Sequence, residues 1–182
     1  LLWQSQLILN NKNASFIIGC KKKFDDLIEI FVKVDDSPGL FYKLANIFEH
    51  AGLEIIDASI FTSKNNKFAA NTFIAKYSRH DRILNKSELI ELSSKIESNF
   101  QKVDEIAKKR IVKKKNTKFE KIVKIDESVN IDKNRNLITV ETVDSSGLLA
   151  NISRVFFENG VSIYSARINT LGERVEDTFE IE

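Results

Sequence analysis

In the first half of the chain, hydrophobic residues recur in some segments at every second position, as in a strand, and in another at helical spacing. In residues 29–34, EIFVKV, apolar and polar positions alternate, which is typical of a β-strand with one buried face. Residues 40–51 then place leucine, isoleucine, phenylalanine and alanine at helical spacing. Two more β-rich runs follow, at residues 53–62 and 69–77. The pattern predicts the order strand, helix, strand, strand.

The second half of the chain repeats this order. Residues 136–143 predict a strand, residues 148–156 an amphipathic helix, and residues 161–170 and 175–182 two further strands. When Gly39 is aligned with Gly147, the halves match without a gap from the Asp36/Asp144 pair to Thr62/Thr170, with ten identities in 27 positions. Such self-similarity indicates an internal structural repeat.

Both predicted units resolve into a known arrangement of elements. In the first half, residues 86–102 predict a second helix with Ser87 as its N-cap, and residues 118–129 predict a fourth strand. The resulting order is β-α-β-β-α-β, and the fold class is α+β with two ferredoxin-like units. The second unit stops after its third strand, so we expect an exposed apolar face and an unpaired sheet edge there.

Composition restricts the cellular setting and the chemistry. The chain has 182 residues, a net charge of +2 and one cysteine, Cys20, which predicts a reducing compartment, the cytoplasm. It begins at Leu1 and contains no methionine, so we expect a fragment or a processed product. No apolar run has the length of a membrane span. The one His-Asp pair, His80 with Asp81, lacks further ligands nearby, so we predict no metal site and no catalytic residue.

The repeated turn between the first strand and the helix is the main candidate site. A helix N-terminus presents free N–H groups and a partial positive charge that suit a carboxylate, and a glycine there lets a ligand approach the backbone. An aspartate beside it could accept hydrogen bonds from an ammonium group, so the turn suits a free amino acid. The alternative is plain helix capping. We favour the second copy, and the candidate residues are Asp144, Ser145, Ser146, Gly147, Leu148, Leu149, Asp36, Ser37, Pro38, Gly39 and Leu40.

Two longer strings carry a resemblance to a known family. Residues 57–74, DASIFTSKNNKFAANTFI, and residues 166–181, ARINTLGERVEDTFEI, resemble the C-terminal tandem ACT domains of the bifunctional uridylyltransferase/uridylyl-removing enzymes. The resemblance implies a helix tail and an extra strand from an upstream domain at 1–23, a first ACT domain at 24–130 and an incomplete second one at 131–182.

The same resemblance implies a ligand and partners. The ligand would be L-glutamine or a similar small amino acid, the partners would be upstream catalytic domains of the same chain, and the parent enzyme would act on the nitrogen-regulatory protein PII. Mg²⁺ is expected for those catalytic domains, and no cofactor for this region. Contacts with other domains are expected from Arg167, Glu173, Arg174, Glu176 and Asp177. Two alternatives stay open: a tandem ACT regulator for another amino acid, and a nucleic-acid-binding module using the basic residues 108–115.

Overall fold

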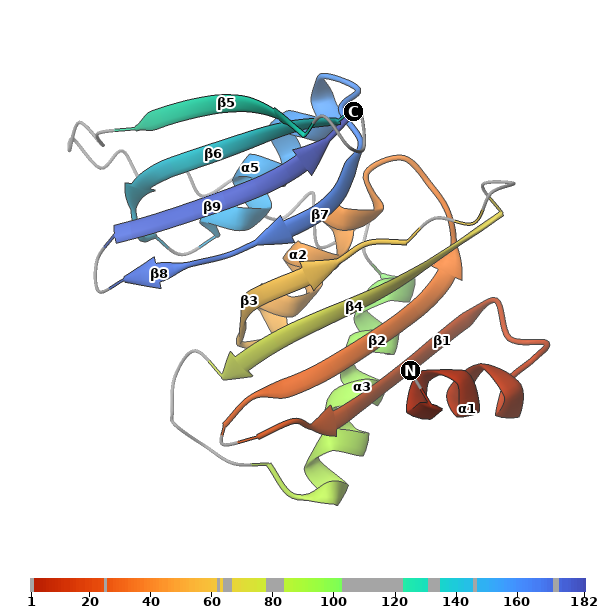
Figure 1. Cartoon of the computed structure of the whole chain (residues 1–182). Helices are drawn as coiled ribbons and strands as arrows, with labels where there is room; N and C mark the ends of the chain where they lie inside the picture. Colours follow the sequence, from red (N-terminus) through yellow and green to blue (C-terminus); the bar gives the residue numbers. More distant parts are fainter. Residues whose placement is uncertain are drawn as a thin grey trace.

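The fold is a single antiparallel sheet with helices on both faces (Figure 1). The computed structural model describes residues 2–24, 26–61, 63, 67–77, 84–102, 123–130, 135–145, 147–171 and 174–182. A first unit contains α1 (Leu2–Asn10), β1 (Phe16–Lys22), β2 (Ile28–Asp35), α2 (Leu40–Ala51), β3 (Leu53–Ser59), β4 (Phe68–Tyr77) and α3 (Lys86–Gln101). A second unit contains β5 (Lys124–Asn130), β6 (Arg135–Val143), α5 (Leu148–Glu158), β7 (Ile163–Arg167), β8 (Thr170–Leu171) and β9 (Arg174–Ile181).

The two units join edge to edge and are related by a pseudo-two-fold axis. The strand order is β1-β2-β4-β3-β7-β9-β6-β5, and β3 pairs with β7. At the centre of that pairing, Ala58 lies opposite Ala166, its own counterpart in the repeat. The Ile60 N–H donates to the Tyr164 carbonyl at 3.2 Å, and the symmetry-equivalent Ile168 N–H donates to the Ile56 carbonyl at 3.2 Å. The repeat in the sequence is therefore a repeat in space, and the predicted ferredoxin-like α+β fold is confirmed.

The fourth strand of each unit comes from an unexpected place. β1 pairs with β2 in the first unit, and β5 pairs with β6 in the second. The prediction that residues 118–129 complete the first sheet was therefore wrong, and β5 instead forms the outer edge of the sheet in the second unit. Five residues separate β1 from β2 and four separate β5 from β6. Short connections close at small entropic cost, which favours these local hairpins over a more distant pairing.

Helix cover differs between the two units. In the first unit α2 and α3 cover one face, where Phe48 and Phe73 meet edge to face at 4.7 Å, and Phe100 of α3 lies on Phe16 of β1. In the second unit α5 covers the corresponding face beside α2. No described helix covers β5, and Ile125 and Val129 on its helix side are 63% and 59% exposed. This confirms the expected exposed apolar face.

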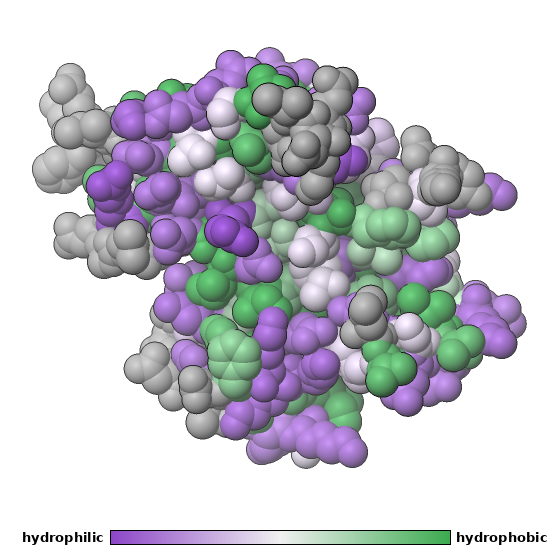
Figure 2. Space-filling view, in the orientation of Figure 1, coloured by the Kyte–Doolittle hydropathy of each residue, from purple (hydrophilic) through white to green (hydrophobic). Residues whose placement is uncertain are grey.

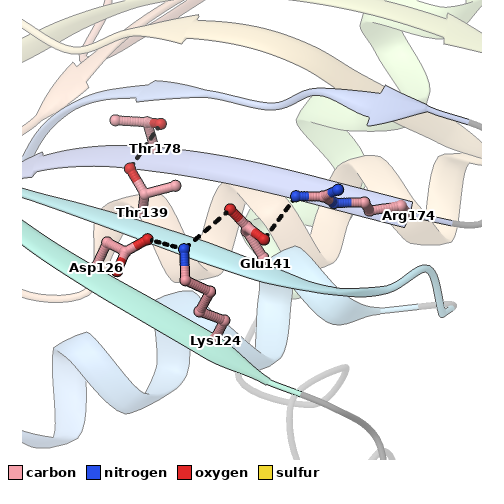
Figure 3. Close-up of polar contacts among 6 residues, drawn as sticks. All are labelled: Lys124, Asp126, Thr139, Glu141, Arg174 and Thr178. Carbon is pink, nitrogen blue, oxygen red and sulfur yellow. Dashed lines mark hydrogen bonds and ion pairs between the residues drawn. The ribbon is translucent and has the colours of Figure 1, made fainter.

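The opposite faces of the two units differ as well. In the first unit α1 lies across the sheet, with Trp3 edge-on to Phe31 at 6.5 Å (Figure 1). In the second unit the outer face of β5, β6 and β9 presents polar side chains, and Figure 2 shows many hydrophilic residues there. Figure 3 shows Glu141 between Lys124 and Arg174, with Arg174 bound at 2.6 Å. None of the described helices is long and apolar enough to cross a membrane.

The start of α3 also differs from the prediction. Asn85 is its N-cap and accepts a hydrogen bond from the Glu88 N–H at 3.0 Å, while the Glu88 carboxylate accepts from the Asn85 N–H at 2.8 Å. This reciprocal capping box starts the helix before Ser87, the residue expected from the sequence.

Candidate functional site

In the part of the chain that the structure describes, neither repeated turn has a side chain that caps the N-terminus of its helix. Gly39 and Gly147 are the N-caps of α2 and α5, with φ of 73° and 77°, and neither helix has a side-chain cap hydrogen bond. The turns are closed by the backbone instead: the Leu40 N–H donates to the Ser37 carbonyl at 3.1 Å, and Leu148 repeats this with Ser145 at 2.9 Å. Among the described residues, no aspartate or serine of either turn caps its helix, and N–H groups of each first helical turn have no acceptor there.

A pocket of about 760 Å³ lies at the first turn, which we define as residues 36–40. Its walls come from both units: the first unit supplies the turn, the start of α2 and residues of β4, and the second unit supplies the end of α5 and residues 160–164. This size falls within the range of small-molecule sites. Because both units line it, a ligand bound there would contact both.

Asn71 provides the most informative polar group of this pocket. It sits in β4 opposite Val32, lines the pocket, and is only 1% exposed. Its Oδ1 has no hydrogen-bond partner among the described residues. Buried amide oxygens are normally paired, and an unpaired one costs about 1–3 kcal/mol. A ligand with an N–H donor would remove that cost.

Phe157 of α5 closes the pocket against the first turn. Its ring stacks on Tyr42 of α2 at 6.3 Å, and its carbon atoms lie 2.7–2.9 Å from where a Cβ on Gly39 would stand. A side chain at position 39 would collide with this ring, and the positive φ independently disfavours one. Glycine is thus required both by the backbone and by the second unit's approach.

The second turn, residues 144–149, has a counterpart of Asn71. Asp177 of β9 lies opposite Val140, as Asn71 lies opposite Val32, and is also 1% exposed. Burial raises the pKa of the Asp177 carboxyl to about 7; a hydrogen bond from the Asn169 backbone opposes this shift and the charge of Asp144 adds to it. Asp177 Oδ1 has no partner among the described residues.

The structure separates the predicted site residues into two groups. Asp36, Ser37, Pro38, Gly39 and Leu40 all line the pocket between the units. The second group, which we favoured, lies at the pseudo-symmetric turn and does not line that pocket. In this group Ser146 is outside the described residues.

The predicted interdomain residues occupy different environments. Arg167 lies opposite Asp57 at the seam between the units, and Arg174 is bound to Glu141. Asp177 is buried, because its position in β9 turns the side chain toward the helix side of the sheet. Glu176 faces the other side of that strand, and Glu173 is outside the described residues.

Sequence analysis missed the residues that complete the pocket. Asn71, Phe157 and residues 160–164 were not predicted, although a signal for Asn71 exists. The strings NTF at 71–73 and DTF at 177–179 hold the same place in the two copies, each with a polar residue where the strand is otherwise buried. The ungapped alignment ended before them, because the loop lengths differ by two residues.

Two other predicted features fall outside the described residues. These are the basic residues 108–115 and the His80-Asp81 pair. In the described part of the chain, no group of three or more histidine, cysteine, aspartate or glutamate side chains could hold a metal ion.

Comparison with known proteins supports the family resemblance. No protein-family model matches the chain. A bifunctional uridylyltransferase/uridylyl-removing enzyme from Burkholderia lata is 29% identical over 183 residues, covering 98% of this chain and 21% of the enzyme. Its namesakes from Burkholderia vietnamiensis and a Psychrobacter species are both 28% identical and cover 100% of the chain and 21% of their own lengths.

One solved structure, a putative glycine cleavage system transcriptional repressor, is 14% identical and covers 85% of this chain and 78% of its own. Its TM-score of 0.27 is too low to support an argument. The relatives, by contrast, match nearly every residue of the chain, which spans about a fifth of their length. The chain is homologous over its whole length to the C-terminal region of the bifunctional uridylyltransferase/uridylyl-removing enzymes.

Proposed function

We propose that this chain is a regulatory region that binds L-glutamine in the pocket between its two units. The observation that carries the proposal is the buried Asn71 Oδ1, which has no partner among the described residues, in a pocket that also contains a helix N-terminus without a described side-chain cap. Such a pocket offers an acceptor, Asn71 Oδ1, to one end of a small molecule and the N–H donors of the helix to the other end.

The chemistry of the pocket suits an amino acid with a side-chain amide. The free N–H groups at the start of α2 would bind the α-carboxylate, and the Asp36 carboxylate would accept from the α-ammonium group. Asn71 would pair with the side-chain amide, accepting from its NH₂ through Oδ1 and donating through its own NH₂. L-Glutamate has no N–H donor at that end and would leave Oδ1 unpaired, so we expect it to bind at least about tenfold more weakly.

Control over enzyme activity would come from the position of the pocket between the units. Phe157 and residues 160–164 form one wall, and the first turn forms the other. A ligand that contacts both walls favours the arrangement in which they face each other, and this population shift would be reported to attached uridylyltransferase and uridylyl-removing domains. The attachment of these catalytic domains, and PII as their substrate, are part of what we propose.

Isothermal titration of the chain with L-glutamine, L-glutamate and L-asparagine tests the binding step. We expect glutamine to bind most tightly, and Asn71→Leu to weaken its binding by about tenfold or more. Asn46→Ala is the matched control, because Asn46 is equally buried in the first unit but its side chain donates to the Tyr42 carbonyl within α2. Equal affinity for glutamine and glutamate would contradict the proposal.

A further inference from the structure

Helix α1 docks on the face of the first unit's sheet that lies opposite to the pocket (Figure 1). The Trp3 ring meets Phe31 edge to face at 6.5 Å, and the Lys21 ammonium lies 4.7 Å from the centre of the Trp3 ring. Gly19 of β1 leaves room for Leu7, because a Cβ at position 19 would stand 2.5 Å from Leu7 Cδ1. The sheet therefore has a docking site that fits this helix.

A polar contact connects α1 to the strand that carries Asn71. The Gln4 side-chain NH₂ donates to Thr72 Oγ1 at 3.1 Å and to Glu29 Oε1 at 3.1 Å. Thr72 follows Asn71 directly in β4, and successive side chains of a strand point to opposite faces of the sheet. Asn71 thus faces the pocket while Thr72 faces α1. One segment of β4 contacts both the pocket and the helix.

Strand β2 makes the same connection a second time. Val32 lies opposite Asn71, and Phe31 lies opposite Thr72. Val32 is fully buried on the helix side of the sheet, and Phe31 supports the Trp3 ring on the other side. A displacement of either strand at the pocket therefore reaches the docking site of α1 one residue away.

The attachment of α1 is weak enough to be reversible. All nine residues of the helix are described, and none of them is buried. An isolated helix of this length is only marginally stable in water, so α1 depends on its contacts with the sheet. The second unit has Asp126 and Thr139 at the places that Gly19 and Phe31 occupy in the first (Figure 3). Only the unit whose strand carries Asn71 thus has this apolar docking site among the described residues.

We propose that the docking of α1 on the outer face of the first unit is coupled to ligand binding in the pocket. This inference rests on the proposed function and adds a route by which the bound state of the pocket is transmitted through the sheet. A ligand bonded to Asn71 holds β2 and β4 in the arrangement on which α1 docks, so the docked form binds the ligand more tightly. By linkage, the ligand strengthens docking by the same factor.

The fluorescence of Trp3 measures docking, because Trp3 is the only tryptophan of the chain. L-Glutamine is expected to shift its emission to shorter wavelength in a saturable way. Two variants undock α1 from opposite sides of the contact: Leu7→Asp on the helix, and Gly19→Val on the sheet, where valine suits a strand but fills the space of Leu7. Each should shift the emission to longer wavelength and weaken glutamine binding, measured by isothermal titration, about fivefold.

Leu9→Asp and Thr178→Val are the matched controls. Leu9 is an exposed residue of the same helix, and Thr178 is the counterpart of Thr72 in the second unit, where it lies 3.2 Å from Thr139 (Figure 3). Neither change should alter the emission of Trp3 or the affinity for glutamine. Wild-type glutamine affinity in both undocked variants overturns the proposal.

A measurement without ligand separates this proposal from the proposed function. Undocking by Leu7→Asp should shift the NMR signal of the Asn71 side-chain amide, and Leu9→Asp should leave that signal in place. A chain that shows this shift but does not bind glutamine refutes the proposed function and supports the coupling of α1 to the pocket. A chain that binds glutamine but does not show the shift refutes the coupling alone.

Discussion

Replacing Asp177 by asparagine is expected to change how the stability of the chain depends on pH. The folded protein holds this carboxyl with a pKa of about 7, raised by burial from its ordinary value of 3.8. Between these two values the folded chain keeps a proton that the unfolded chain has lost. The free energy of unfolding of the wild type therefore falls as pH rises through this window.

The size of the effect follows from the two pKa values. The two pKa values differ by about 3 units. Relative to a chain in which Asp177 is protonated in both states, this difference lowers the free energy of unfolding by about 4 kcal/mol at pH 8, where both states are ionised, and by about 1.5 kcal/mol at pH 5. Asparagine cannot ionise, and its shape matches that of aspartate. The first unit already holds an asparagine, Asn71, at the equivalent buried position, so the fold accommodates it.

Urea denaturation of both proteins at several pH values measures this effect. We expect the free energy of unfolding of Asp177→Asn, relative to the wild type, to increase by about 2.5 kcal/mol between pH 5 and pH 8. Glu176→Gln is the control, since this neighbour faces the other side of β9, and it should change little. The opposite change, Asn71→Asp, should make the stability of the chain fall more steeply with pH.

A parallel pH dependence in the wild type and Asp177→Asn would refute the reasoning. It would mean that Asp177 ionises in the folded chain as easily as in the unfolded one. The surroundings of Asp177 would then contain a donor that compensates for the water lost on burial.

Three further predictions concern residues other than Asp177. Gly39→Ala and Gly160→Ala should each destabilise the chain by about 1 kcal/mol because of the positive φ at both positions. Gly39→Ala should cost more, because its Cβ would meet the Phe157 ring, whereas a Cβ at Gly160 meets nothing within 4 Å. Thermal denaturation of the two variants measures the difference. Asn85→Ala should cost about 1 kcal/mol in urea denaturation by removing the capping box, while Ser87→Ala should cost little. Burial raises the pKa of the Cys20 thiol to about 11, so iodoacetamide at pH 8 should label it slowly in the folded chain and at the ordinary thiol rate in urea; equal rates would contradict this.

Sequence pattern predicted the units of this fold better than their connections. Alternation and helical spacing give the type of each element, and the ten identities give the repeat. They do not say which edge a strand will join. β5 was correctly expected as a strand, yet it pairs with β6, because the short connection makes this hairpin easier to close.

The candidate site was predicted only in part for a similar reason. The Asp36–Leu40 turn stands out in sequence because it recurs. Its opposite wall, formed by Phe157 and residues 160–164, comes from the other copy of the repeat, and their proximity depends on how β3 and β7 join. A sequence pattern within one unit contains no information about that join.

The most direct test of the central claim is an NMR titration of the chain with L-glutamine. The account predicts saturable shifts at the Gly39 amide, at the side-chain amide of Asn71, and at residues 160–164 across the pocket. Signals on the distant helix α3 should stay in place. Shifts confined to one unit, or none at all under conditions where the chain is folded, would contradict it.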